Sequence, residues 1–300
     1  MIVNRAYAGA ADLRRMQASV ADAYAITSLR VGDLAWLTRY HSHRDLSLHI
    51  RLWEDDSGQV VGWTYLRTFG GFNVFVAPGH ADETLLDEML AEVVDAAAAA
   101  VATGDPPVSL YTYGLDLARS TEDRALAAAL ERHGFRRAPT TEGVMTRSLD
   151  EVPEPVLPAG YRLGWVETRE QGIGRVEAQR AAFAPSDFLL ERYERIRRTW
   201  PYRAELDRIV LTEDATVVAF CTAWLDERNG AGLLEPVGTH PDHQRRGLAS
   251  AVCLDALRAL RAAGARVAQV GFGSEAGRAT YSSIGFALNA TDLVYRRDPS

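Results

Sequence analysis

The residues from Gln244 to Ser250 combine positive charge, small side chains and a helix start in a way that suits the binding of a phosphate. Arg245 and Arg246 supply two fixed charges, and Gly247 and Ala249 lack the bulk that would keep an anion away from the backbone. Apolar residues then recur at helical spacing, so the free N–H groups and the positive dipole end of a new helix lie at the same place. This stretch predicts an anion site made by Gln244, Arg245, Arg246, Gly247, Leu248, Ala249 and Ser250.

A buried strand is expected to lead into this loop. Residues 232–239 are mostly apolar, and Pro241 then marks a turn. Glu235 is the exception on the strand, because burying a carboxylate costs free energy unless the group is paired or has a function. Glu235 is therefore a candidate general base or substrate anchor, and pairing with an arginine of the other half of the chain is the alternative explanation.

The spacing of Gln244, Gly247 and Ala249 resembles the acyl-CoA pyrophosphate loop of the GNAT acetyltransferase superfamily. Val237, Gly238 and Thr239 resemble the end of the fourth strand of that family. The resemblance implies that acetyl-CoA is the co-substrate and that these residues contact it. A dinucleotide-binding loop fits less well because G-x-G-x-x-G is absent, and a P-loop is excluded because its lysine is missing. An ordinary helix start with surface arginines is the alternative.

A second motif of the family lies near the C-terminus. Tyr281, Gly285 and Phe286 match its spacing, while Ser274 and Gly277 replace the usual Asn and Ala. The resemblance implies that Tyr281 lies near the CoA sulfur and protonates the departing thiolate, and Ser274 is a further cofactor-binding candidate. A phenol with a pKa of about 10 holds its proton at pH 7 and can donate it. A tyrosine that only packs beneath the sheet is the alternative.

The order of predicted elements occurs twice along the chain. Ala77-Pro78 corresponds to His240-Pro241, and Gly134-Phe135 corresponds to Gly285-Phe286. We therefore predict an α/β fold of two tandem GNAT-like domains, each a mostly antiparallel mixed sheet flanked by helices, as in the similar mycothiol synthases. The expected division is a domain at 1–150, an acidic and Pro-rich linker at 151–158, and a domain at 159–300.

The first copy lacks the residues that the second copy would use. The stretch after Pro78 begins Gly79-His80-Ala81 and lacks the Gln, Gly and Ala of the loop motif, and Leu130 stands where the second copy has Tyr281. Carboxylates occupy the first helical turns instead and would repel a diphosphate. We expect domain 1–150 to be structural and domain 159–300 to bind acyl-CoA; the carboxylates are those of Asp82, Glu83, Asp87 and Glu88.

Composition limits the remaining possibilities. A net charge of −7 and a pI of about 5.6 argue against nucleic-acid binding, and the absence of lysine excludes Schiff-base chemistry. No apolar run approaches a membrane span and no signal peptide opens the chain, so we expect no membrane association and a cytoplasmic location. Cys221 and Cys253 lie in apolar runs and are expected in the core without a disulfide. Pro241 separates His240 from His243, so no metal site is expected.

These observations predict an N-acetyltransferase that moves an acetyl group from acetyl-CoA to the amine of an unidentified small molecule, acting as a monomer or homodimer. An acyl-CoA-binding regulatory protein without turnover, an O-acyltransferase and a longer-chain acyltransferase are the alternatives. Six aromatic residues are candidates to line the substrate pocket or to fill the core: Phe183, Phe188, Tyr193, Trp200, Tyr202 and Trp224.

Overall fold

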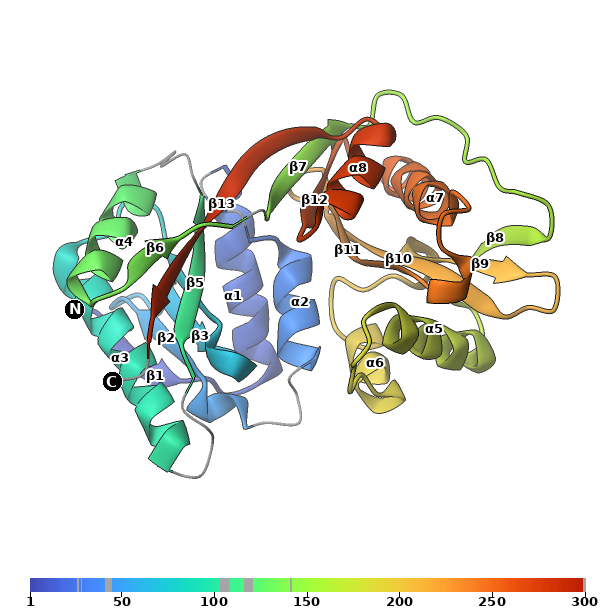
Figure 1. The fold of residues 1–300 in the computed structure, drawn as a ribbon. Coiled ribbons are helices and arrows are strands. Elements are labelled where there is room, and N and C mark those ends of the chain that lie inside the picture. The colour runs from blue at the N-terminus through green and yellow to red at the C-terminus, as the bar shows by residue number, and fades with distance from the viewer. Residues whose placement is uncertain are drawn as a thin grey trace. The chain divides into compact units, whose positions relative to one another are not determined.

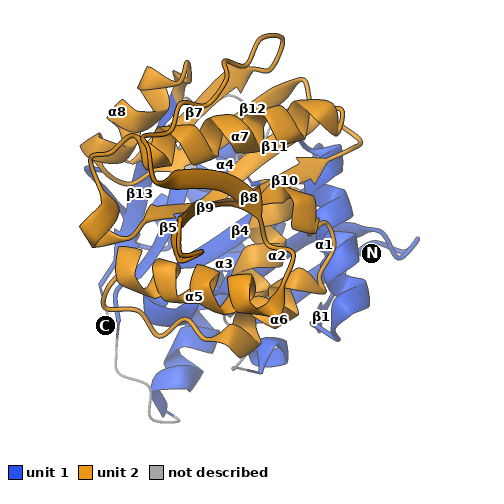
Figure 2. Cartoon of the chain, turned by 90° about the vertical axis from the view of Figure 1, so that its right-hand side faces the viewer, with its two compact units in different colours: residues 1–29, 41–141, 290–300 blue, residues 30–40, 142–289 orange. Residues whose placement is uncertain are grey.

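The structure is a computed structural model, and it describes residues 1–25, 27, 29–40, 45–102, 108–115, 121–140 and 142–298. The chain divides into two compact units (Figure 2). Unit 1 consists of residues 1–29, 41–141 and 290–300, and unit 2 consists of residues 30–40 and 142–289. The expected α/β architecture of two sheets flanked by helices is confirmed.

Unit 1 contains a four-stranded antiparallel sheet in the order β1-β2-β3-β4. Its apolar strands and amphipathic helices bury a core that includes Leu130, Phe135 and Phe72. The strands of this sheet are β1 (Val3–Ala6), β2 (Ile50–Glu54), β3 (Val60–Leu66) and β4 (Phe72–Val76), and the helices are α1 (Ala10–Asp22), α3 (Glu83–Ala102) and α4 (Thr121–Arg132).

Unit 2 contains a longer run of strands in the order β8-β9-β10-β11-β12-β7. Only the β11–β12 pair in this run is parallel. Helices α5 and α6 lie on one side of β8 to β12, and α7 and α8 lie on the other (Figure 1). The strands are β7 (Gly143–Ser148), β8 (Tyr161–Trp165), β9 (Asp207–Thr212), β10 (Val217–Asp226), β11 (Ala231–Thr239) and β12 (Val267–Phe272), and the helices are α2 (Val31–Tyr40), α5 (Arg169–Ala182), α6 (Leu190–Arg197), α7 (Leu248–Ala262) and α8 (Glu275–Ser283).

The two units do not follow the linear order of the chain. Strand β7 comes before the expected linker in sequence, yet all six of its residues pair with β12 of unit 2. In return, β13 (Ala287–Arg297) comes last in the chain and pairs in unit 1 with β5 (Leu110–Leu115) and β6 (Arg136–Ala138). Helix α2 also belongs to unit 2 although it lies within the first 40 residues. The expected boundaries at 150 and 158 follow the sequence order and do not mark these exchanged segments.

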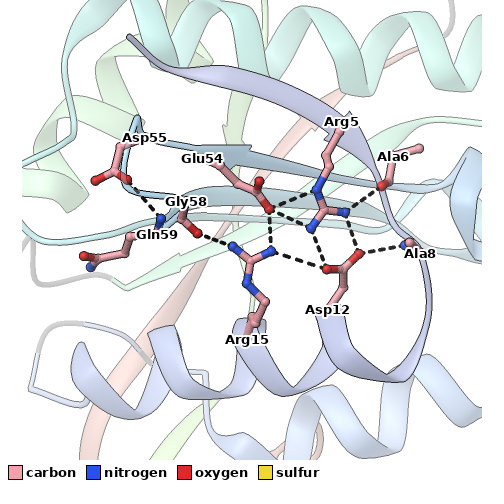
Figure 3. Close-up of polar contacts among 9 residues, drawn as sticks. All are labelled: Arg5, Ala6, Ala8, Asp12, Arg15, Glu54, Asp55, Gly58 and Gln59. Carbon is pink, nitrogen blue, oxygen red and sulfur yellow. Dashed lines mark hydrogen bonds and ion pairs between the residues drawn. The ribbon is translucent and has the colours of Figure 1, made fainter.

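An ion-pair cluster joins β1, β2 and α1 in unit 1 (Figure 3). The guanidinium of Arg5 donates to both carboxylate oxygens of Asp12 at 2.6 Å and to Glu54 at 2.6 Å. Arg15 adds a further hydrogen bond to Glu54. The hydrogen bond from Arg5 lowers the pKa of Asp12. Burial raises the pKa of Glu54, but hydrogen bonds from Arg5 and Arg15 lower it by more, so that it lies below its ordinary value. Because both carboxylates are bonded to arginines, this cluster is structural.

Replacing Asp12 with Asn should lower the free energy of unfolding by about 2 kcal/mol at pH 7, because it leaves Arg5 without its bidentate partner. The pKa of Asp12 lies below its ordinary 3.8 in the folded state, so this stabilisation is present above about pH 4 and disappears as the pH falls below it. Urea denaturation at pH 7 and pH 3 measures both effects. The control is Asp95→Asn on α3, where the residue is exposed. An equal loss for the two variants would contradict the assignment.

Candidate active site

Strand β11 carries an irregularity where the sequence placed Glu235. Leu234 pairs with Ala223 and Val237 pairs with Cys221, so two residues of β11, Glu235 and Pro236, stand opposite the single residue Thr222 of β10. This is a β-bulge, and proline fits it because the bulge does not require its missing N–H. The bulge turns the rest of β11 away from its other neighbour.

The parallel pairing of β11 with β12 ends at Leu234 and Val270. Beyond this point β11 continues to Thr239 and pairs only with β10 among the described residues, while Gly271 and Phe272 of β12 pair with β7. The two strands therefore part, and the edge of β11 that faces β12 presents backbone groups over residues 235–239. An extended ligand can add to such an edge as an extra strand.

The loop after β11 keeps its backbone accessible at the start of α7. The residues from Gln244 to Gly247 are exposed, and Gly247, at φ 77°, is the residue before the helix. A Cβ built on Gly247 would meet no atom within 4 Å, so the space in front of the helix is open. The first hydrogen bond of the helix runs from the Ala251 N–H to the Gly247 carbonyl. Helix geometry therefore directs the N–H groups of Leu248, Ala249 and Ser250 into this space.

Arg245 and Arg246 lie beside this space and are exposed. Arg245 adopts the left-handed conformation with φ 58°, and Arg246 donates to the carbonyl of Asp242 at 3.4 Å. Gln244 donates to the carbonyl of Thr239 at 3.4 Å, which ties the loop to the end of β11. Charge, dipole and open amides thus meet at one point, as a diphosphate requires.

The remaining predicted residues of β11 have different roles in the structure. The hydroxyl of Thr239 is buried and has no hydrogen-bond partner among the described residues, so it can bond to a ligand. Gly238 is needed for packing, because a Cβ there would stand 2.4 Å from the ring of Phe220. Val237 is half-buried and packs against the cluster that contains Cys221.

Tyr281 is 8% exposed and lies on α8 in the same apolar cluster as Cys221, Cys253 and Phe286. Burial raises the pKa of its phenol above 10.0, and the negative charge of Glu235 raises it further. The phenol therefore keeps its proton at neutral pH. Ser274 caps α8, since its hydroxyl accepts from the Gly277 N–H at 3.2 Å.

A buried polar network on the α5–α6 face supports the bulge, and no pattern in the sequence predicts it. Asp207 is 0% exposed and accepts from Thr222 at 2.8 Å and from Tyr193 at 2.6 Å. Arg175, also 0% exposed, donates to Thr222 at 3.0 Å and lies 3.5 Å from Asp207. The sequence signal was weak, because a single Arg within a helix or a single Asp at the start of a strand is ordinarily solvent-exposed.

The aromatic candidates divide into two groups. Phe188, Tyr193 and Trp224 are buried, Tyr202 is half-buried, and Phe183 and Trp200 are 48% and 41% exposed. The three buried side chains are core, as the alternative explanation for them stated.

His240 and His243 belong to the turn before the loop. His240 Nδ1 accepts from the Asp242 N–H at 3.3 Å, and His243 Nδ1 lies 2.9 Å from the Tyr161 hydroxyl. Among the described residues, no group of three or more His, Cys, Asp or Glu side chains could hold a metal ion. Cys221 and Cys253 are both free and buried, as expected.

In the corresponding helix of unit 1, α3, one acidic side chain caps the first turn and two others pair with neighbouring residues. Asp82 accepts from the Leu85 N–H at 3.0 Å, Asp87 pairs with Arg132, and Glu88 accepts from Trp53 at 3.0 Å. An amide that a phosphate would need is therefore bonded to a carboxylate.

Titration calorimetry with acetyl-CoA should give one site per chain, because the carboxylates at the start of α3 repel a diphosphate. Asp82→Ala should leave that stoichiometry unchanged, since the loop residues are also absent from unit 1. Two sites per chain in the unmodified protein would contradict the prediction that unit 1 has no acyl-CoA site.

The model of the Acetyltransferase (GNAT) family matches residues 173–286, so the expected resemblance is confirmed over the region that holds the loop and Tyr281. No curated protein matches the chain. Solved structures share its fold along almost the whole length. One is a GCN5-related N-acetyltransferase from Sphaerobacter thermophilus, with TM-score 0.68 and 17% identity, covering 99% of this chain and 95% of that one.

A second similar structure is a tandem GNAT protein from the clavulanic acid biosynthesis pathway, with TM-score 0.65, 14% identity and 100% of both chains covered. A third is a putative acetyltransferase from Pyrococcus horikoshii, with TM-score 0.57, 13% identity, and 100% and 90% covered. The expected tandem GNAT fold is confirmed. Among the residues that the structure describes, no helix has both the length and the apolar character needed to cross a membrane.

Proposed function

We propose that this chain, whose residues 173–286 form a GNAT acetyltransferase domain, transfers an acetyl group from acetyl-CoA to the amine of a small molecule. The observation that carries the proposal is the open edge of β11 over residues 235–239, which leads directly to the open N-terminus of α7. The open edge of β11 suits a pantetheine arm, and the N-terminus of α7 suits a diphosphate. The two features are adjacent, as the pantetheine and diphosphate groups are in CoA.

The contacts to acetyl-CoA follow from this placement. The diphosphate binds the N–H groups at the start of α7, with Gln244, Arg245 and Arg246 beside it. The pantetheine arm lies along Val237, Gly238 and Thr239, and its amides bond to the backbone of β11. Ser274 already accepts a hydrogen bond as the cap of α8, so its O–H remains available to donate to acetyl-CoA.

The acetyl group moves in a single direct attack. The nitrogen of the amine forms a bond to the thioester carbon, the C–S bond breaks, and the thiolate of CoA takes a proton from Tyr281. Glu235 accepts the proton that the amine loses, directly or through water. Burial raises the pKa of the Cys221 thiol, and its hydrogen bond with Cys253 raises it further. Because the thiolate is the nucleophile, this shift disfavours a covalent intermediate on Cys221.

The proposal is tested by measuring thiol release from acetyl-CoA with a panel of primary amines and matched primary alcohols. We expect release with at least one amine, a product of the mass of its acetamide, and a slower reaction with the matching alcohol. Binding of acetyl-CoA without release by any acceptor would favour a regulatory protein, and faster release with alcohols would indicate an O-acyltransferase. A cytoplasmic location and a monomeric or dimeric state belong to the same proposal.

A further inference from the structure

The backbone of the bulge is held by a tryptophan from the neighbouring strand. The indole Nε1–H of Trp224 on β10 donates to the carbonyl oxygen of Glu235 at 2.6 Å. Trp224 is 0% exposed, so this bond is shielded from water and fixes the carbonyl that precedes Pro236. The position of the Glu235 backbone therefore depends on where the indole lies.

The indole is itself fixed on two sides. The ring of Tyr202 lies edge-on at 6.2 Å, and the Tyr202 hydroxyl donates to the buried Asp207 at 3.0 Å. Helix α2 also contacts the indole, and it packs on α6, β10 and β11 within unit 2. A Cβ added to Gly32 of this helix would stand 2.3 Å from Cγ of Trp224. Only glycine at this position leaves room for the indole.

Strand β10, which faces the bulge of β11, is fixed by a hydrogen bond to a buried carboxylate. Thr222 faces Glu235 and Pro236 across the irregular register, and its hydroxyl donates to Asp207 at 2.8 Å. Tyr202, which packs against Trp224, donates to the same carboxylate. Asp207 therefore fixes both Thr222 and the ring that supports Trp224. The structure thus fixes both strands at the place where the proposed base stands.

We propose that Trp224 and Gly32 are positioning residues for acetyl transfer: α2, from the first 40 residues, seats the indole that sets the Glu235 backbone. This inference rests on the proposed function and names a role for a segment that carries none of the acetyltransferase motifs. A base that is displaced by about 1 Å can cost about 100-fold in rate, so a small shift of the indole has a measurable effect.

The test uses the full chain labelled with ¹⁵N, acetyl-CoA and the best amine of the panel. The six tryptophans give indole N–H signals, and the signal of Trp224 is identified by its loss in Trp224→Phe. In Gly32→Ala we expect this signal to shift, kcat to fall about tenfold or more, and the Kd for acetyl-CoA to stay within about twofold. Trp224→Phe, which keeps an aromatic ring but removes the donor, should show the same split between kcat and Kd.

The matched control is Gly172→Ala on α5, where the added Cβ would be 3.5 Å from Tyr193, an ordinary contact. It should change neither the Trp224 signal nor kcat. An unshifted signal in Gly32→Ala, or a shifted signal with full kcat, would overturn the positioning role. If Gly32→Ala does not fold, full kcat in Trp224→Phe overturns it equally. A wild-type protein that acetylates no amine would instead remove the proposed function, and this inference with it.

Discussion

Replacing Tyr281 with Phe lowers kcat about 100-fold and leaves the Kd for acetyl-CoA within about twofold of the wild-type value. The expectation follows from the position of Tyr281 on α8, in the buried cluster against which Val237 of β11 packs. Phe fills nearly the same volume, so the change removes the proton donor and keeps the packing. Stopped-flow thiol release and titration calorimetry measure the two quantities.

The pH dependence provides a second check on Tyr281. Because burial raises its pKa above 10.0, the phenol stays protonated through neutral and mildly alkaline pH. The rate of the wild-type protein should therefore not fall between about pH 7 and pH 10 through loss of this proton. The same shift means that the fold loses stability as the pH rises above the ordinary tyrosine pKa, because only the unfolded chain then ionises freely.

The control for Tyr281→Phe is Tyr295→Phe in unit 1, where the ring is 2% exposed. Both changes remove one hydroxyl from a mostly buried ring, and only the first should reduce kcat. A Tyr281→Phe variant with full kcat at every pH would show that Tyr281 is not the general acid.

Replacing Gly247 with Glu should abolish detectable binding of acetyl-CoA. The glutamate would extend into the space before α7, where nothing lies within 4 Å of the position of its Cβ, and would place a negative charge at the diphosphate position. A positive φ also makes any side chain costly there, at about 1 kcal/mol. Gly247→Ala measures that strain separately, because it has no charge, and should retain binding.

Gly264 provides the matched control at the other end of α7. It too has a positive φ, of 100°, and open space around its Cβ position. Gly264→Glu should therefore cost similar stability and leave the Kd for acetyl-CoA unchanged. Equal loss of binding in both glutamate variants would indicate general damage to the helix and contradict a diphosphate site at its start.

Local patterns in the sequence were sufficient to predict most elements of this fold. The helix ends at Gly134-Phe135 and Gly285-Phe286 were expected to correspond, and both use the same bond, from the Phe N–H to the carbonyl of Leu130 or Tyr281. A positive φ at each glycine makes this ending possible, and glycine is the residue that adopts it most readily. Short-range chemistry of this kind can be predicted without a structure.

The features that were not predicted depend on long-range packing. No local pattern links Gly32 to Trp224 or Asp207 to Thr222, because each pair forms only when distant segments meet. The three-residue strand β6 was also missed, since Arg136–Ala138 has no apolar alternation and owes its strand conformation to pairing with β13. Likewise β7 reads as the last strand of the first copy but pairs with β12.

Each half of the chain supplies a strand to the other unit: β7 pairs in unit 2, and β13 pairs in unit 1. The two halves therefore depend on each other to complete their sheets. A fragment that ends before the Pro-rich segment would lack the strand that fills the edge of its own unit, and a fragment that begins after it would lack both β7 and α2. Truncation to one copy would thus leave an unpaired sheet edge in each product, which is a site for aggregation. The exchange links the copy that lacks the proposed acyl-CoA loop to the copy that contains it, so neither copy completes its sheet alone.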